Sequence, residues 1–143
     1  DFQSKQLSKI VPGQMGANVS GRKGLLWMSP DEAMVLVPKD QASVVAAEIG
    51  QTLSNVHALV VDVSDARAVF ELNGQGAAEV ISKLAPADIV AMAPHQLART
   101  RLAQVPAATW KVDAGKMGVI CFRSVQDYVF DILAMSIKNG PVL

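Results

Sequence analysis

The chain has 143 residues, of which 50% are hydrophobic, and its 13 basic and 13 acidic side chains give a formal net charge of zero. This balance argues against nucleic-acid binding, which normally needs a basic surplus or stripe. The single cysteine excludes an internal disulfide and fits a reducing compartment. No apolar run approaches the ~20 residues that a membrane span requires, and no apolar signal segment is apparent. We therefore expect a cytoplasmic protein that contacts neither membrane nor nucleic acid.

The mean hydropathy of +0.27 is high for a small soluble protein. Part of the apolar surplus can cover a partner protein, because soluble monomers rarely expose large apolar patches. An interior rich in alanine and valine is the alternative. The length corresponds to one domain, which we expect over residues 25–143.

Residues 1–24 contain Pro12 and several glycines among polar residues, without a sustained period. This composition predicts a flexible N-terminal arm that orders only against a partner. The chain begins at Asp1 rather than Met, so N-terminal sequence is expected to be absent from it.

Two short strands and a helix are expected next. Residues 25–28 form an apolar strand, and Ser29, followed by Pro30 and an acid at position 32, predicts one helical turn. Residues 33–37 form a second strand, antiparallel to the first because the connection is short. Val45, Ile49 and Leu53 have helical spacing and predict a helix over residues 41–53.

The middle of the chain predicts a strand pair and a second helix. Residues 59–63 are mostly valine, and residues 66–72 alternate in polarity, so the turn residues Ser64 and Asp65 would join two paired strands. A helix follows over residues 77–84 and ends before Pro86.

The last part of the chain predicts three strands and a helix. Residues 86–98 are expected as a crossing loop. The expected strands are residues 99–105, 109–112 and 117–123, with Pro106 separating the first two and residues 113–116 forming a turn. Ser124 is expected to cap the final helix. The face of that helix is expected to comprise Val125, Tyr128, Val129, Ile132, Leu133 and Ile137.

The summed order, ββαββαβββα, predicts an α+β fold: an antiparallel sheet with helices on one face, built from two ββα-type halves.

Catalytic, cofactor-binding and metal-binding groups are not evident in the sequence. His57 and His95 fall in predicted loops or strand entries, without the spacing of a zinc site. Gly74 and Gly76 lack the third glycine of a dinucleotide-binding motif. Cys121 lies in an apolar strand, where a buried, inert thiol is expected rather than a nucleophile.

Charged side chains offer two weaker hypotheses. Asp62 and Arg67 could meet across the predicted hairpin, as a structural ion pair or as part of a ligand pocket. Arg99, Arg101 and Arg123 could grip carboxylates of a partner or an anionic ligand if they share a sheet face. The alternative for these arginines is a solvated polar face.

Large apolar side chains near predicted strand and loop ends indicate a partner surface, because Trp and Met are favoured in interface cores. The expected partner-binding residues are an apolar patch rimmed by arginines: Trp27, Met28, Met92, Trp110, Arg99 and Arg101.

Six segments, taken in this order, carry a resemblance to a known family. They are Trp27-x-Ser29-Pro30-Asp31-Glu32, Val61-Asp62-Val63-Ser64-Asp65-Ala66-Arg67, Leu72-Asn73-Gly74 with Ala77, Pro86-Ala87-Asp88-Ile89, residues 99–104, and Arg123-Ser124-x-x-Asp127-Tyr128. Together they resemble the gamma-subunit family of heterotetrameric sarcosine oxidase, over roughly residues 25–133.

The resemblance implies a fold similar to part of the folate-binding aminomethyltransferase domain. It also implies an accessory gamma subunit with alpha, beta and delta partners, in an oxidoreductase complex that demethylates sarcosine and passes the one-carbon unit to tetrahydrofolate. In such a complex FAD, FMN, NAD, tetrahydrofolate and zinc belong to the other chains. Three alternatives stay open: a subunit of a related N-methyl amino-acid dehydrogenase, a stand-alone folate- or amino-acid-binding module, and a small dimeric regulatory domain with a ferredoxin-like sheet. Self-association of the isolated chain is also expected to be possible.

Overall fold

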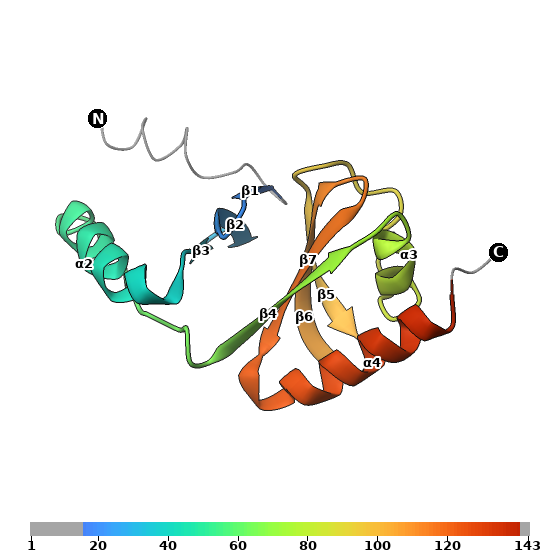
Figure 1. Ribbon diagram of the computed structural model, residues 1–143. Helices are drawn as coiled ribbons and strands as arrows, with labels where there is room; N and C mark the ends of the chain where they lie inside the picture. Colours follow the sequence, from blue (N-terminus) through green and yellow to red (C-terminus); the bar gives the residue numbers. More distant parts are fainter. Residues whose placement is uncertain (1–15, 141–143) are drawn as a thin grey trace.

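The structure is a computed structural model that describes residues 16–140, and it consists of two antiparallel sheets with helices around them (Figure 1). The elements, in chain order, are β1 (Ala17–Ser20), β2 (Lys23–Ser29), β3 (Glu32–Leu36), η1 (Lys39–Gln41), α2 (Ala42–Thr52), β4 (Arg67–Asn73), α3 (Ala77–Ser82), β5 (Leu97–Leu102), β6 (Val105–Asp113), β7 (Lys116–Phe122), η2 (Arg123–Val125) and α4 (Gln126–Lys138).

The first three strands form a small sheet in the order β1-β2-β3. Residues 17–24, expected in the arm, form β1 and the start of β2, while residues 1–15 of that expected arm lie outside the described residues. The two strands predicted at 25–28 and 33–37 are present and antiparallel. The helical turn predicted at 29–32 is wrong: Pro30 and Asp31 form a tight turn because Ser29 and Glu32 are already paired across it.

The remaining strands form a four-stranded sheet in the order β4-β7-β6-β5. The strand predicted at 59–63 is absent, and the predicted hairpin is wrong: β4 pairs with β7 along its whole length, from Arg67 opposite Phe122 to Asn73 opposite Lys116. This long ladder satisfies more backbone groups than a short local hairpin could.

The boundary between β5 and β6 also differs from the prediction. Pro106 lies inside β6, opposite Arg101, and the chain turns at Ala103, whose φ is 48°. The ladder between β6 and β7 begins only at Ala107, so the missing N–H of Pro106 interrupts no bond to β7.

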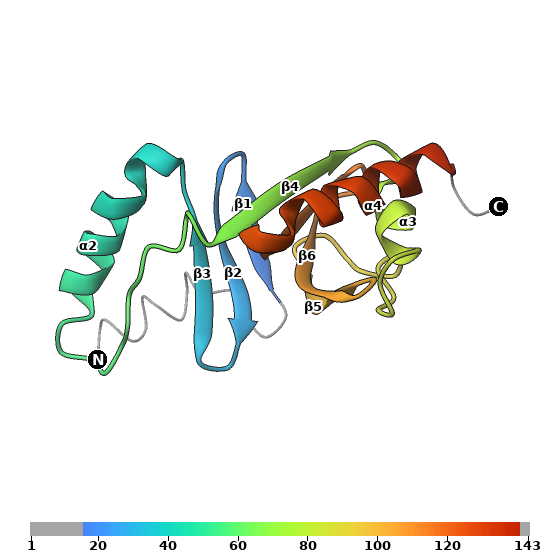
Figure 2. The same ribbon diagram turned by 90° about the horizontal axis from the view of Figure 1, so that it is seen from below.

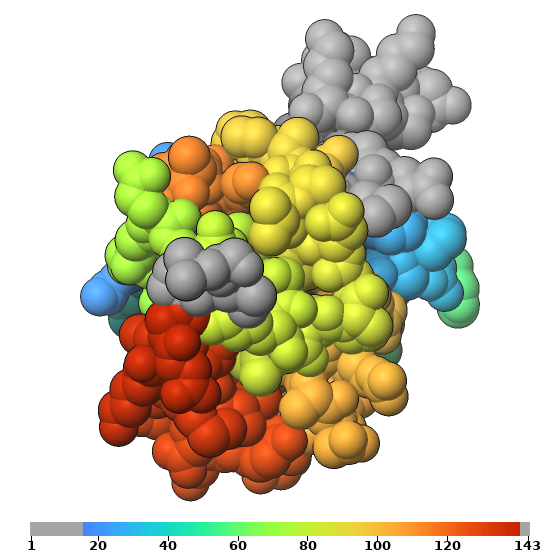
Figure 3. All heavy atoms as spheres, turned by 90° about the vertical axis from the view of Figure 1, so that its right-hand side faces the viewer, coloured from blue at the N-terminus to red at the C-terminus, as the bar shows by residue number. Residues whose placement is uncertain are grey.

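Helices α3 and α4 cover one face of the four-stranded sheet, as predicted (Figure 2). Their buried side chains pack with Met117, Val119 and Cys121 of β7. Figure 3 shows α3, the connection to β5 and α4 lying together on this side of the molecule.

The beginning of α4 differs from the prediction. Residues 123–125 form a 3₁₀ turn, so the helix starts at Gln126, and Ser124 makes no capping hydrogen bond. The buried face consists of Val129, Ile132, Leu133 and Ser136, which includes only part of the expected stripe. Tyr128 and Ile137 are exposed.

The small sheet packs on the opposite face of the four-stranded sheet and encloses a second core. Leu26, Met28 and Met34 meet Leu97, Ala108, Trp110 and Ile120 there. The indole of Trp110 lies directly over Gly118 of β7, since a Cβ built on Gly118 would come within 2.1 Å of the Trp110 ring. The fold is therefore layered, with the four-stranded sheet in the middle.

The connection between β3 and β4, residues 39–66, stands apart from these layers, and we call it the excursion. It contains η1, α2 and the extended segment that leads to β4 (Figures 1 and 2). The predicted helix is present, yet no residue of α2 is buried. No helix of the described part is long and apolar enough to cross a membrane.

Candidate functional site

A groove of about 510 Å³ lies where the small sheet meets β4, β6 and β7. Its walls come from the turn after β1, from the end of β3, and from the sides of β4 and β7. The lining residues are Val19, Gly21, Arg22, Leu36, Val37, Pro38, Lys39, Val69, Phe70, Glu71, Trp110, Val112, Lys116, Met117 and Gly118.

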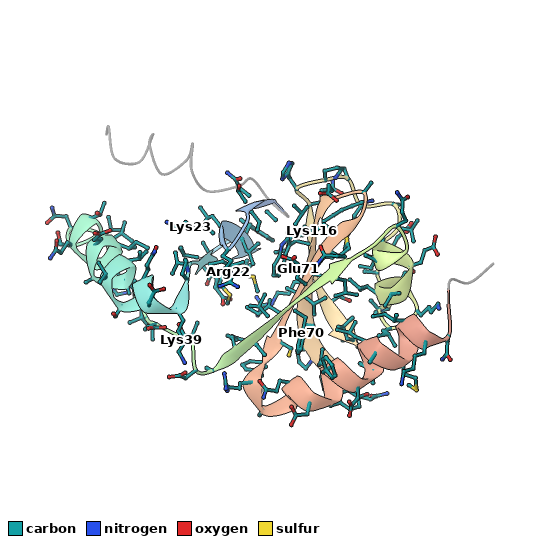
Figure 4. The ribbon with its side chains drawn as sticks, in the orientation of Figure 1. Arg22, Lys23, Lys39, Phe70, Glu71 and Lys116 are labelled. Carbon is teal, nitrogen blue, oxygen red and sulfur yellow. The ribbon has the colours of Figure 1, made fainter. Side chains whose placement is uncertain are left out.

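The charged residues that line this groove are Arg22, Lys39, Lys116 and Glu71, which are labelled in Figure 4. Lys116 Nζ lies 3.0 Å from a carboxylate oxygen of Glu71. The side-chain amide of Asn73 donates a hydrogen bond to the same carboxylate and, with Lys116, lowers the pKa of Glu71. Lys39 Nζ lies 2.9 Å from a carboxylate oxygen of Asp65. The groove thus combines an apolar floor with three basic side chains, two of which are paired with carboxylates.

A second hollow, of about 420 Å³, lies between the start of β4 and the start of α4. Arg67 and Arg123 line it, and the guanidinium of Arg67 stacks 3.9 Å above the ring of Phe122. Such stacking is a cation–π contact. The Nε atom of Arg67 is buried and has no hydrogen-bond partner among residues 16–140.

The predicted pairing of Asp62 with Arg67 is wrong. The carboxylate of Asp62 accepts hydrogen bonds from the backbone N–H and the hydroxyl of Ser64, which lower its pKa. A turn closes from Ala66 to Val63, but the residues before it form no strand, so Arg67 enters β4 and stacks on Phe122 instead.

Two of the predicted partner-binding residues are core residues. Trp110 is 3% exposed and Met28 is 7% exposed, so an exposed patch built on them is wrong. Both side chains are buried because the small sheet packs on this face of the four-stranded sheet. Trp27 and Met92 are half-buried.

The arginines have different environments. Arg99 donates to the carbonyl of Met28 and contacts Glu32, at 3.3 Å in each case, so it joins β5 to the small sheet. Arg101 is exposed on the same strand. Arg123 lies in η2, outside the sheet, so the three arginines do not share one sheet face. A partner-binding role for Trp27, Met92, Arg99 and Arg101 stays a prediction.

The residues with reactive side chains lie apart from one another. Cys121 is buried in β7, as the sequence predicts, and burial raises the pKa of its thiol. His57 is exposed in the excursion, and His95 precedes β5 with a φ of 66°. Within residues 16–140 no three His, Cys, Asp or Glu side chains gather as a metal-binding set.

Many of the exposed large apolar side chains lie in two parts of the described chain, the excursion and α4. In the excursion Leu59 is 89% exposed, and Val44, Val56 and Val61 are more than half exposed. On α4 the exposed apolar residues are Tyr128, Phe130, Met135 and Ile137. One signal in the sequence marks the excursion: residues 40–66 contain no Lys or Arg.

Comparison with known proteins gives a consistent result. The profile described as "Sarcosine oxidase, gamma subunit family" matches residues 3–134. Sarcosine oxidase subunit gamma from an Arthrobacter species is 32% identical over 105 residues, which are 71% of this chain and 51% of the relative. The protein of the same name from Corynebacterium sp. (strain P-1) has the same identity and coverage. The chain therefore spans about half the length of the curated relatives it matches.

A solved structure extends the likeness to the fold. It is described as heterotetrameric sarcosine oxidase from Corynebacterium sp. U-96 in complex with pyrrole 2-carboxylate. One of its chains superposes with a TM-score of 0.83 at 21% identity, covering 99% of this chain and 75% of that one. The α+β fold with antiparallel sheets is thus shared with that chain.

Proposed function

Because this chain belongs to the sarcosine oxidase gamma-subunit family, we propose that it is a non-catalytic accessory subunit of a heterotetrameric oxidase. The proposed complex oxidatively demethylates sarcosine and transfers the one-carbon unit to tetrahydrofolate. Its alpha, beta and delta subunits are the proposed partners, and FAD, FMN, NAD, tetrahydrofolate and zinc are assigned to those chains. We place the complex in the cytoplasm.

One observation carries the accessory role. The helix α2 has no buried residue, and the segment after it exposes four large apolar side chains: Val56, Leu59, Val61 and Val63. Exposed apolar surface of this kind marks an interaction site in a soluble protein. This exposure is expected if partner subunits cover these apolar side chains in the complex.

Assembly measurements test this proposal. The chain is co-expressed with the alpha, beta and delta subunits, and the purified material is analysed by size-exclusion chromatography and for sarcosine oxidation. We expect the chain to co-elute with the other three, and its omission to lower the yield of active complex. A complex that forms and turns over sarcosine equally well without the chain would contradict the proposal.

The basic groove favours one alternative, a module that binds folate or an amino-acid carboxylate. Arg22, Lys39 and Lys116 would meet the anionic group, and the apolar floor would meet the rest of the ligand. A ligand that binds only the folded state raises the melting temperature. A rise of a few degrees in the isolated chain with saturating folate or glycine would favour this alternative, whereas an accessory subunit should show none.

A further inference from the structure

We propose that residues 59–63 of the excursion add as a strand to the free sheet edge of a partner subunit, and that Lys and Arg side chains flank that edge. This inference rests on the proposed function, because it names the surface through which the accessory subunit joins its complex.

The backbone of this segment lacks internal partners. From His57 to Val63 no backbone N–H donates to another backbone group of residues 16–140, and only the carbonyl of Val63 accepts such a bond, from Ala66. The flanking bonds, from Val56 to Leu53 and from Ala66 to Val63, close local turns at each end. An extended stretch of unpaired donors and acceptors is what strand addition uses.

The side chains have the period of a strand. Leu59, Val61 and Val63 are 89%, 57% and 37% exposed, and alternate residues of an extended chain lie on one face. Val60 between them is less exposed. The segment therefore presents a row of apolar side chains although it belongs to neither sheet of the described residues.

An ordinary surface loop does not explain this composition. Solvated connections are rich in Gly, Pro, Asn, Asp and Ser, each of which helps the chain to turn. Residues 56–61 contain none of these five residue types and include three valines. An exposed, unpaired segment with strand propensity invites aggregation unless something covers it.

Charge indicates the chemistry of the covering partner. The excursion beyond Lys39 holds Asp40, Glu48, Asp62 and Asp65 and no basic residue. Residues 40–66 thus carry a net charge of −4, while the rest of the chain, with all 13 basic and nine of the 13 acidic residues, carries +4. Complementary potential favours a partner edge lined by Lys and Arg.

Hydrogen exchange tests the pairing directly. The amides of residues 59–63 are compared in the isolated chain and in the complex co-expressed with the alpha, beta and delta subunits. We expect rapid exchange in the isolated chain and slowing of about 100-fold or more at alternate residues in the complex, because a strand donates every second amide to one neighbouring edge and ladder hydrogen bonds protect those amides. The turn at residues 113–116 serves as the internal control and should not change.

Variants separate the backbone from the side chains. Val61→Pro removes one ladder donor and should weaken assembly about 10-fold or more while leaving the isolated fold unchanged. Val61→Ser tests the apolar row. Val90→Ser is the matched control, since Val90 is 52% exposed but lies in the connection between α3 and β5, and it should assemble as the unchanged chain does.

The outcomes distinguish the two proposals. A wild-type chain that joins the complex but keeps fast exchange at 59–63 overturns the strand addition alone. Protection already present in an isolated chain that is dimeric also overturns it, in favour of a second copy as the occupant. A wild-type chain that never joins the complex overturns both. If Val61→Pro unfolds the isolated chain, the exchange result on the wild type decides.

Discussion

At the scale of single residues, Trp110 packs closely on Gly118. The two residues are directly opposite on β6 and β7, and the glycine leaves the space that the indole fills. Thr109, the neighbour of Trp110, is fully buried and donates its hydroxyl to the carbonyl of Gly118, 2.8 Å away. Through these two contacts β6 and β7 are held together at Gly118.

Substituting Gly118 by Ala should therefore destabilise the chain by about 1–3 kcal/mol, because the new Cβ overlaps the indole. The control is Gly50→Ala in α2, where nothing lies within 4 Å, and it should stabilise by up to about 1 kcal/mol through helix propensity. Thermal unfolding followed by circular dichroism measures both. Equal melting temperatures for the two variants would contradict the assigned packing.

The position of Trp110 also shows what the sequence leaves open at this scale. Its type and its place near a strand end fit an interface residue as well as a core residue. Only the pairing of β6 with β7, and the small sheet laid over them, decide between the two. Cys121, inside a continuous apolar run, needed no such information and was predicted correctly.

At the scale of elements, α4 is joined to α3 by more than apolar contact. The hydroxyl of Ser136, which is 4% exposed, donates to the carbonyl of Val80 at 2.9 Å. The sequence pattern predicted the helix, but it indicated Ser124 at the beginning of the helix, and not Ser136, as the serine that makes a structural hydrogen bond. The spacing of the apolar residues predicts the helix itself. The 3₁₀ turn at residues 123–125 directly follows β7, and the local pattern does not reveal it.

Two serine substitutions distinguish these roles. Ser136→Ala should cost about 1 kcal/mol, since it removes a buried hydrogen bond. Ser124→Ala should change the free energy of unfolding by less than about 0.5 kcal/mol, because its side chain makes no capping bond. Urea denaturation gives both values. A larger loss for Ser124→Ala would restore Ser124 as the helix cap.

Most strands and all the longer helices were predictable from local pattern, but the partner of β4 was not. Residues 59–63 have strong strand propensity, and a nearby turn made a local hairpin plausible. Strand pairing is decided by long-range contacts, and β7, almost fifty residues later, provides the better edge. A segment with strand propensity was left unpaired, which is the feature that the local pattern could not reveal.

At the scale of the whole molecule, the layered body and the excursion differ in how firmly they are held. Two buried clusters join the sheets and the helices α3 and α4, whereas α2 contributes no buried residue to either cluster. Opening that exposes few buried contacts costs little free energy. The isolated chain should be locally least stable between α2 and β4.

Limited proteolysis should locate this weakness. Trypsin has no site in residues 40–66, which lack Lys and Arg, but thermolysin cleaves before large apolar residues such as Leu59 and Val61. We expect the first thermolysin cuts in residues 56–63, identified by mass spectrometry, and slower cleavage there in the assembled complex. First cuts inside β6 or β7 would contradict this order of stability.

Because Trp110 is buried between the two sheets, its fluorescence emission reports on the contact between them. The chain has only two tryptophans, and Trp110 is 3% exposed while Trp27 lies on β2 of the small sheet. An indole in an apolar setting emits at shorter wavelength than one in water. If the small sheet parts from the larger one, the emission of Trp110 should shift to the red, with Trp27→Phe isolating the signal. The contact between the sheets can thus be followed by tryptophan fluorescence in the intact chain, alone and in the proposed complex.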